Sequence, residues 1–228
     1  MRRKIPITLT IEEIQKILKI PNERTRTGLR NKTILSFIWD SGARVSDVIN
    51  LKPGDLNIGE REATVIGGKG GVDRIITFSE YTAGLLKRYK DVRPKGKYFF
   101  CTEYQANNPK IRKGKGKNKL ARVYLYNMIG KYSRRAGINK KIGLHTLRHS
   151  FALNFYKNSG HDLISLQKLL GHASLRTTEI YCYMDSTDVK EASAEYYKKR
   201  DLEDNGIQKR IKDLEKQIQE LKADTRTG

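Results

Sequence analysis

The chain has 228 residues, and its 46 lysines and arginines against 25 aspartates and glutamates give a formal net charge of +21. Hydrophobic residues make up 37% of the sequence, enough for a folded core, which excludes a disordered basic tail. A folded body with this charge is expected to bind a polyanion, and nucleic acid is favoured over a membrane because the sequence has no long apolar span or lipidation signal.

The two cysteines, Cys101 and Cys182, form no CxxC motif and no Cys/His cluster, so we predict neither a metal site nor a cofactor. The basic N-terminus lacks an apolar signal-peptide core. A reducing, cytoplasmic setting fits both observations.

The first part of the chain predicts short helices. Thr10 and Glu13 have the spacing of a capping box, and apolar residues on one helical face follow them, so a helix is expected from Thr10 to just before Pro21. A second helix is expected over residues 29–39, ended by Gly42, and a third over residues 46–51.

The pattern then changes to that of a small antiparallel sheet. Residues 63–66 and 74–78 are β-prone and are separated by a glycine-rich segment around Lys69, which indicates a hairpin with a flexible tip. A helix over residues 79–89, a short apolar run at 98–101 and a basic, glycine-rich loop at 110–122 follow.

The rest of the chain is predicted to be helical. Amphipathic helices are expected over residues 122–136, 145–158 and 162–170, and shorter helical runs over 175–184 and 187–201. The expected fold is therefore α+β, mainly helical, with one small antiparallel sheet.

The last residues have a separate pattern. Residues 201–228 hold six basic and seven acidic residues, so the positive charge lies in residues 1–200. Apolar residues follow a heptad spacing: Ile207, Ile211, Leu214, Ile218 and Leu221. We expect a domain over residues 1–200 and a helical tail over 201–228 for self-association, although docking of this helix on its own domain is an alternative.

Several segments together resemble the tyrosine recombinase (phage integrase) family. They are residues 41–47 (SGARVSD), the Gly-Lys-Gly tip at 68–70, and residues 145–150 (HTLRHS), 170–174 (LGHAS) and 177–181 (TTEIY). The resemblance covers about residues 9–184 and implies the catalytic-domain fold of that family. It also implies site-specific cleavage and rejoining of double-stranded DNA through a 3′-phosphotyrosyl intermediate.

By this resemblance the catalytic residues are Arg44, Lys69, His145, Arg148, His172 and Tyr181. A tyrosine suits a reversible phosphate linkage because phenoxide, with a pKa of about 10, is a far better leaving group than an alkoxide. Two guanidinium groups can clamp phosphate oxygens with planar forks. The spacing of three residues places His145 and Arg148 on one helical face.

The resemblance also implies finer roles. His145 would accept the tyrosine proton or bind the phosphate, and His172 would donate a hydrogen bond to a phosphate oxygen. Lys69 would be the general acid for the departing 5′-hydroxyl, and Asp47 would orient a catalytic side chain.

Alternatives exist for several residues. Tyr183 is the second candidate for the nucleophile, and Lys69 in a glycine turn can simply be solvated. His149 and His161 are expected to be structural, and Cys182 to be inert.

Alternatives also exist for the function. A DNA-relaxing enzyme of the type IB topoisomerase class shares the chemistry, and a non-enzymatic DNA-binding accessory protein shares the fold. The sequence also lacks an N-terminal core-binding domain typical of the family, which indicates either a short protein or a fragment.

Overall fold

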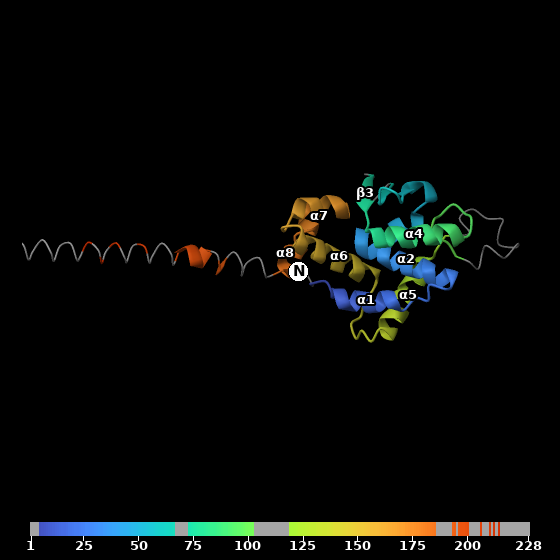
Figure 1. Ribbon diagram of the computed structural model, residues 1–228, viewed down its shortest axis with the longest axis horizontal. Coiled ribbons are helices and arrows are strands. Elements are labelled where there is room, and N and C mark those ends of the chain that lie inside the picture. Colours follow the sequence, from blue (N-terminus) through green and yellow to red (C-terminus); the bar gives the residue numbers. More distant parts are fainter. Residues whose placement is uncertain are drawn as a thin grey trace, which may run out of the picture. The chain divides into compact units, whose positions relative to one another are not determined.

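The computed structural model describes residues 5–66, 73–102 and 119–185, with separate positions at 193, 194, 196–200, 206, 210, 212 and 214. Contacts along the chain divide it into two compact units, Met1–Met184 and Asp185–Gly228. The first unit carries the fold and all of the elements below (Figure 1).

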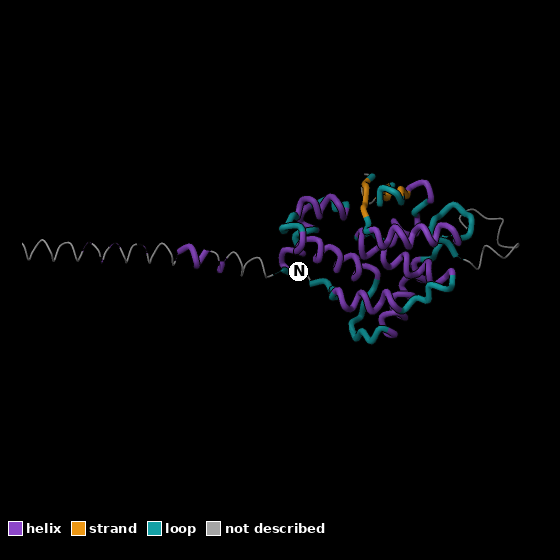
Figure 2. Tube along the Cα trace, in the orientation of Figure 1, coloured by secondary structure: helices purple, strands orange, loops and turns teal. Residues whose placement is uncertain are grey.

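The α-helices are α1 (Ile11–Lys19), α2 (Arg26–Ser41), α3 (Val45–Asn50), α4 (Glu80–Val92), α5 (Arg122–Arg135), α6 (Leu144–Asn158), α7 (Leu163–Leu170) and α8 (Ile180–Met184). The 3₁₀ helices are η1 (Pro53–Asp55) and η2 (Leu175–Thr177), and the strands are β1 (Leu56–Asn57), β2 (Glu62–Val65) and β3 (Arg74–Thr77). Figure 2 shows that helices dominate this unit. The expected mainly helical α+β fold with a small antiparallel sheet is confirmed.

The capping box at the start of α1 forms as predicted. The Thr10 hydroxyl accepts the Glu13 backbone N–H, and the Glu13 carboxylate accepts the Thr10 backbone N–H. Helix α2 begins earlier than the apolar pattern indicated, because Thr25 caps it by accepting the Gly28 backbone N–H. It ends as predicted at Gly42, whose φ of 61° is left-handed.

The three strands pair in the order β1-β2-β3, both pairs antiparallel. Ala63 of β2 pairs with Ile76 of β3, both buried, while Thr64 faces solvent. Strand β1 was not predicted, because two residues carry no alternating pattern. The hairpin tip with Lys69 lies outside the described residues, as does most of the basic loop at 110–122.

Further boundaries differ from the predictions. The apolar run at 98–101 forms only an isolated bridge from Cys101 to Lys119. The helical run expected over 175–184 is divided into η2 and α8. The run expected over 187–201 lies only partly within the described residues.

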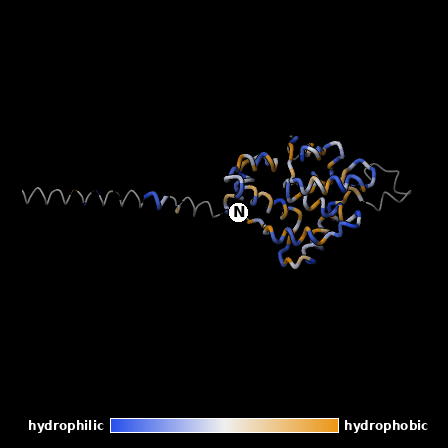
Figure 3. Tube along the Cα trace, in the orientation of Figure 1, coloured by the Kyte–Doolittle hydropathy of each residue, from blue (hydrophilic) through white to orange (hydrophobic). Residues whose placement is uncertain are grey.

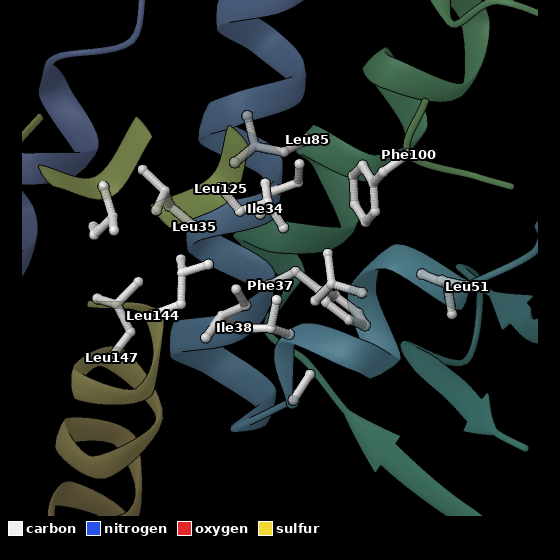
Figure 4. Close-up of a cluster of buried hydrophobic side chains, with 14 of the residues drawn as sticks. Ile34, Leu35, Phe37, Ile38, Leu51, Leu85, Phe100, Leu125, Leu144 and Leu147 are labelled. Atoms are coloured by element: carbon white, nitrogen blue, oxygen red, sulfur yellow. The ribbon is translucent and has the colours of Figure 1, made fainter. Parts of the chain in front are cut away.

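The core surrounds α2, which runs through the middle of the unit beside α4 and α6 (Figure 1). Ile34, Phe37 and Ile38 of α2 have no exposed surface. In Figure 4, Leu144 and Leu147 of α6 lie on one side of α2, and Phe100 lies on the other. Removal of these side chains from water on both faces fixes α2, and with it the loop that follows Gly42.

A second buried cluster joins α6, α7 and α8. Its members are Phe151, Ala152, Tyr156, Leu166, Leu170 and Tyr181. Figure 3 shows that hydrophobic and hydrophilic stretches alternate along the helices of this unit. Within the described residues, no helix is long and apolar enough to cross a membrane.

Candidate active site

A cavity of about 630 Å³ opens where the α2–α3 junction, α6, the end of α7 and α8 meet. It is lined by Arg44, His145, Arg148, His149, Gly171, His172, Ala173, Ser174, Thr177 and Tyr181. The structure therefore brings together five of the six residues that the sequence selected. The sixth, Lys69, lies outside the described residues.

Arg44 enters the cavity from the turn between α2 and α3. Its Nη2 donates a hydrogen bond to the Gly171 carbonyl oxygen at 2.7 Å. Its Nη1 is buried and has no hydrogen-bond partner among the described residues. Burial, followed by the charge of Arg74, lowers the pKa of Arg44. One side of this guanidinium is thus anchored, and the other has a buried donor that an anion can satisfy.

Asp47 lies one turn after Arg44 on α3. Its Oδ2 accepts the Arg44 backbone N–H at 2.9 Å and pairs with Nη2 of Arg74 at 2.5 Å. Both side chains of the ion pair are buried, with 9% of Arg74 and 6% of Asp47 exposed. This pair joins the start of β3 to the α2–α3 junction.

Arg148 is a buried cation on α6. Its Nη1 donates to the Gly42 carbonyl oxygen, and its Nη2 donates to the Leu170 carbonyl oxygen at 2.8 Å. Burial and the nearby Arg44 lower the pKa of Arg148 to about 9, so the side chain remains charged at neutral pH. Because both acceptors are carbonyls at helix ends, they hold the Arg148 guanidinium without neutralising its charge.

His172 follows the left-handed Gly171 that ends α7. Its Nε2 lies 3.1 Å from Nη2 of Arg148, and its Nδ1 lies 2.9 Å from Oγ1 of Thr178. Burial and the Arg148 charge lower the pKa of His172 to about 4. The ring is therefore neutral, with Nε2 accepting from Arg148 and Nδ1 donating to Thr178.

His145 lies one turn before Arg148 on α6. Burial and the charges of Arg148, Arg122 and Arg44 lower its pKa. Three guanidinium groups that act on one imidazole indicate a strongly positive cavity.

Tyr181 lies in α8 with only 1% of its surface exposed. Its Oη is 2.9 Å from Nδ1 of His149. Burial raises the pKa of Tyr181 to about 12, and burial with the His145 charge lowers the pKa of His149 to about 4. In this state a neutral phenol donates to a neutral imidazole. Tyr183 is 76% exposed and does not line the cavity.

Two residues at this site were missed by the sequence analysis. His149 was interpreted as structural, but it contacts Tyr181, and its spacing of four residues from His145 was the available signal. Arg74 stands at the start of β3 and gave no local signal. No three His, Cys, Asp or Glu side chains of the described residues cluster as metal ligands.

Guanidinium groups, neutral histidines and the hydroxyl of a buried tyrosine therefore line one positive cavity. The fold is that of the phage integrase family, and the chain belongs to this family. The family profile matches residues 8–188.

Known proteins of this family are similar over most of the chain. Tyrosine recombinase XerA of Pyrococcus horikoshii is 34% identical over 190 residues, which cover 83% of this chain and 61% of XerA. Tyrosine recombinase XerD of Ralstonia nicotianae is 33% identical over 196 residues, 85% of this chain and 61% of XerD. The chain thus spans about three fifths of the length of these relatives.

Solved structures give the same result. The crystal structure of XerA recombinase has a TM-score of 0.70 at 28% identity, covering 86% of this chain and 65% of that chain. XerH site-specific recombinase, bound to a palindromic difH substrate in a post-cleavage complex, has a TM-score of 0.66 at 30% identity. That match covers 85% of this chain and 54% of XerH.

Proposed function

We propose that this chain cleaves and rejoins DNA strands through a covalent 3′-phosphotyrosyl bond to Tyr181. The observation that carries the proposal is that Tyr181, Arg44 and Arg148 line one cavity. A phosphoryl transfer needs an aligned nucleophile and fixed positive charge for the oxygens of the transition state. Because the tyrosine ester preserves the energy of the phosphodiester, rejoining requires no external energy source.

The two guanidinium groups would bind the scissile phosphate. Arg44 offers Nη1, which has no partner in the described part of the chain, and Arg148 is held by two main-chain carbonyls. Because these donors are already fixed, the reaction requires little free energy to reorganise them. His172 would support Arg148 until a bound phosphate, by its negative charge, favours the protonated imidazole as a further donor.

Loss of the Tyr181 proton is the difficult step. The pKa of Tyr181, raised to about 12, lies far above that of His149, lowered to about 4, so the resting pair does not exchange a proton. As the oxygen bonds to phosphorus, its acidity rises steeply. We therefore assign His149 as the acceptor of this proton, which moves together with O–P bond formation, and His145 as a phosphate ligand.

DNA is the proposed partner because of the charge of +21 and the phosphate site. The XerH structure with its difH substrate supports this assignment. Lys69, on the hairpin after β2, is proposed as the general acid for the 5′-hydroxyl. We also propose that the tail over residues 201–228 mediates self-association, with Leu214 exposed on its helix.

The test is incubation with a nicked suicide substrate, followed by a denaturing gel and peptide mapping. The unsubstituted chain is expected to form a DNA adduct at Tyr181. Tyr181→Phe keeps the buried ring but removes the oxygen, so the adduct should disappear while DNA binding persists. Tyr183→Phe is the matched control and should form adduct normally. An adduct in Tyr181→Phe would contradict the proposed nucleophile.

A further inference from the structure

The charges around the cavity are unbalanced. Arg44, Arg74 and Arg148 influence one another, and Asp47 is the carboxylate that acts on this group among the described residues. A buried carboxylate next to several guanidinium groups can pair with any of them. The guanidinium that does not pair with the carboxylate stays free for a phosphate.

Asp47 is close to Arg44 but does not bind its guanidinium. Its Oδ2 accepts the backbone N–H of Arg44 at 2.9 Å, and its charge opposes the lowering of the Arg44 pKa by burial and by Arg74. Even so, Nη1 of Arg44 is buried without a partner among the described residues. Pairing of two nearby opposite charges in a buried site is strongly favoured, so something must hold the carboxylate elsewhere.

Arg74 is the group that holds it. Its Nη2 is 2.5 Å from the same Oδ2 atom, and the two side chains are 9% and 6% exposed. The stem of Arg74 packs against Gly171, where an added Cβ would lie 2.7 Å from Cδ of Arg74. The carbonyl of the same Gly171 accepts from Arg44. One glycine therefore fixes both guanidinium groups relative to each other.

We propose that Arg74 is a positioning residue that captures the Asp47 carboxylate and so keeps the Arg44 guanidinium unpaired for the scissile phosphate. This inference rests on the proposed function. Arg74 acts through Asp47 and Arg44 and does not itself contact the DNA. This role also explains why a buried arginine at the start of β3 belongs to a phosphate site on α3, α6 and α8.

The experiment is a double-mutant cycle with Arg74→Met and Asp47→Asn, read as the rate of adduct formation on the nicked substrate. Methionine keeps an aliphatic stem against Gly171 and removes the charge. In Arg74→Met the released carboxylate should pair with Arg44, and the rate should fall by about 100-fold, the usual effect of losing one transition-state donor. Asp47→Asn keeps an amide oxygen for the Arg44 N–H but cannot neutralise the guanidinium.

The double variant decides the proposal. Asp47→Asn removes the carboxylate that would otherwise pair with Arg44. Arg74→Met/Asp47→Asn should therefore recover most of the rate lost in Arg74→Met. If Arg74 were merely structural, or if it contacted the phosphate itself, the double variant would be at least as slow as Arg74→Met, and the proposal would be wrong.

Two further variants keep the test decisive. Arg74→Lys retains a charge for Asp47 and should stay within about tenfold of the normal rate, even if Arg74→Met folds poorly. Arg88→Met breaks the exposed ion pair with Glu23 and should react normally. If the unsubstituted chain forms no adduct, the proposed function fails; if it does and the cycle shows no recovery, the role of Arg74 alone fails.

Discussion

His172 is held as a neutral ring by two contacts of opposite kind, with Arg148 donating to Nε2 and Thr178 accepting from Nδ1. Its pKa is lowered to about 4 from the ordinary 6.5. Between these values the unfolded chain binds a proton that the folded chain does not. Stability should therefore rise with pH through this window, and fall as the pH drops from about 6.5 toward about 4.

This pH dependence can be assigned by substitution. Glutamine at position 172 cannot titrate, so His172→Gln should lose less stability than the unsubstituted chain between pH 6.5 and pH 4. The decline that remains comes from His149, whose pKa is also lowered to about 4, and from His145, whose pKa is lowered as well. Urea unfolding across this range measures both slopes. Equal slopes in the two proteins would mean that His172 is already protonated in the folded state.

The residues of the site differ in how far the sequence could predict them. The placement of His145 and Arg148 on one helical face follows from their spacing and needs no knowledge of the fold. The contacts of Tyr181 with His149 and of Asp47 with Arg74 depend on the packing of α8 on α6 and of β3 beside α3. Such pairs join distant parts of the chain, and no local pattern encodes them.

Among the elements, the predictions held wherever a local signal was complete. The capping box starts α1 as predicted, and the left-handed Gly42 and Gly171 stand directly after the last residues of α2 and α7. The start of α2 was missed because its first turn is polar, and β1 because it has only two residues. The cap at Thr25 sets the start of α2, and pairing with β2 forms β1, so apolar periodicity marks neither boundary.

The end of α7 offers a test of how an element positions the site. Gly171 has φ of 61°, and a Cβ there would lie 2.7 Å from Cδ of Arg74. Gly160 has φ of 66° but has nothing within 4 Å of its added Cβ. Gly160→Ala should therefore show backbone strain alone, about 1 kcal/mol, and form adduct normally.

Gly171→Ala should lose more stability than Gly160→Ala and also lose most adduct formation. The added methyl group displaces Arg74 and disturbs the Gly171 carbonyl that accepts from Arg44. Thermal unfolding and the suicide-substrate assay separate the two effects. Equal adduct formation in the two variants would show that the close packing at Gly171 does not position the guanidinium groups.

For the molecule as a whole, we propose that the first unit carries the chemistry and that the tail over residues 201–228 mediates assembly. The described contacts place every cavity residue within Met1–Met184. The heptad residues of the tail, apart from Leu214, lie outside the described residues. A helix of little more than two heptads is marginal alone, so we propose that the predicted apolar face of the tail associates with a partner surface.

The same negative charge placed at two tail positions tests this division. Leu214 stands on the predicted seam, whereas Lys212 stands off it, and both are exposed in the single chain. Leu214→Asp should lower the mass measured by sedimentation, because a charge at a d position opposes association of the helices. Lys212→Asp should leave the mass unchanged, and both variants should keep the circular dichroism of a folded catalytic unit. If the two variants sediment alike, the tail helix associates through another face or not at all.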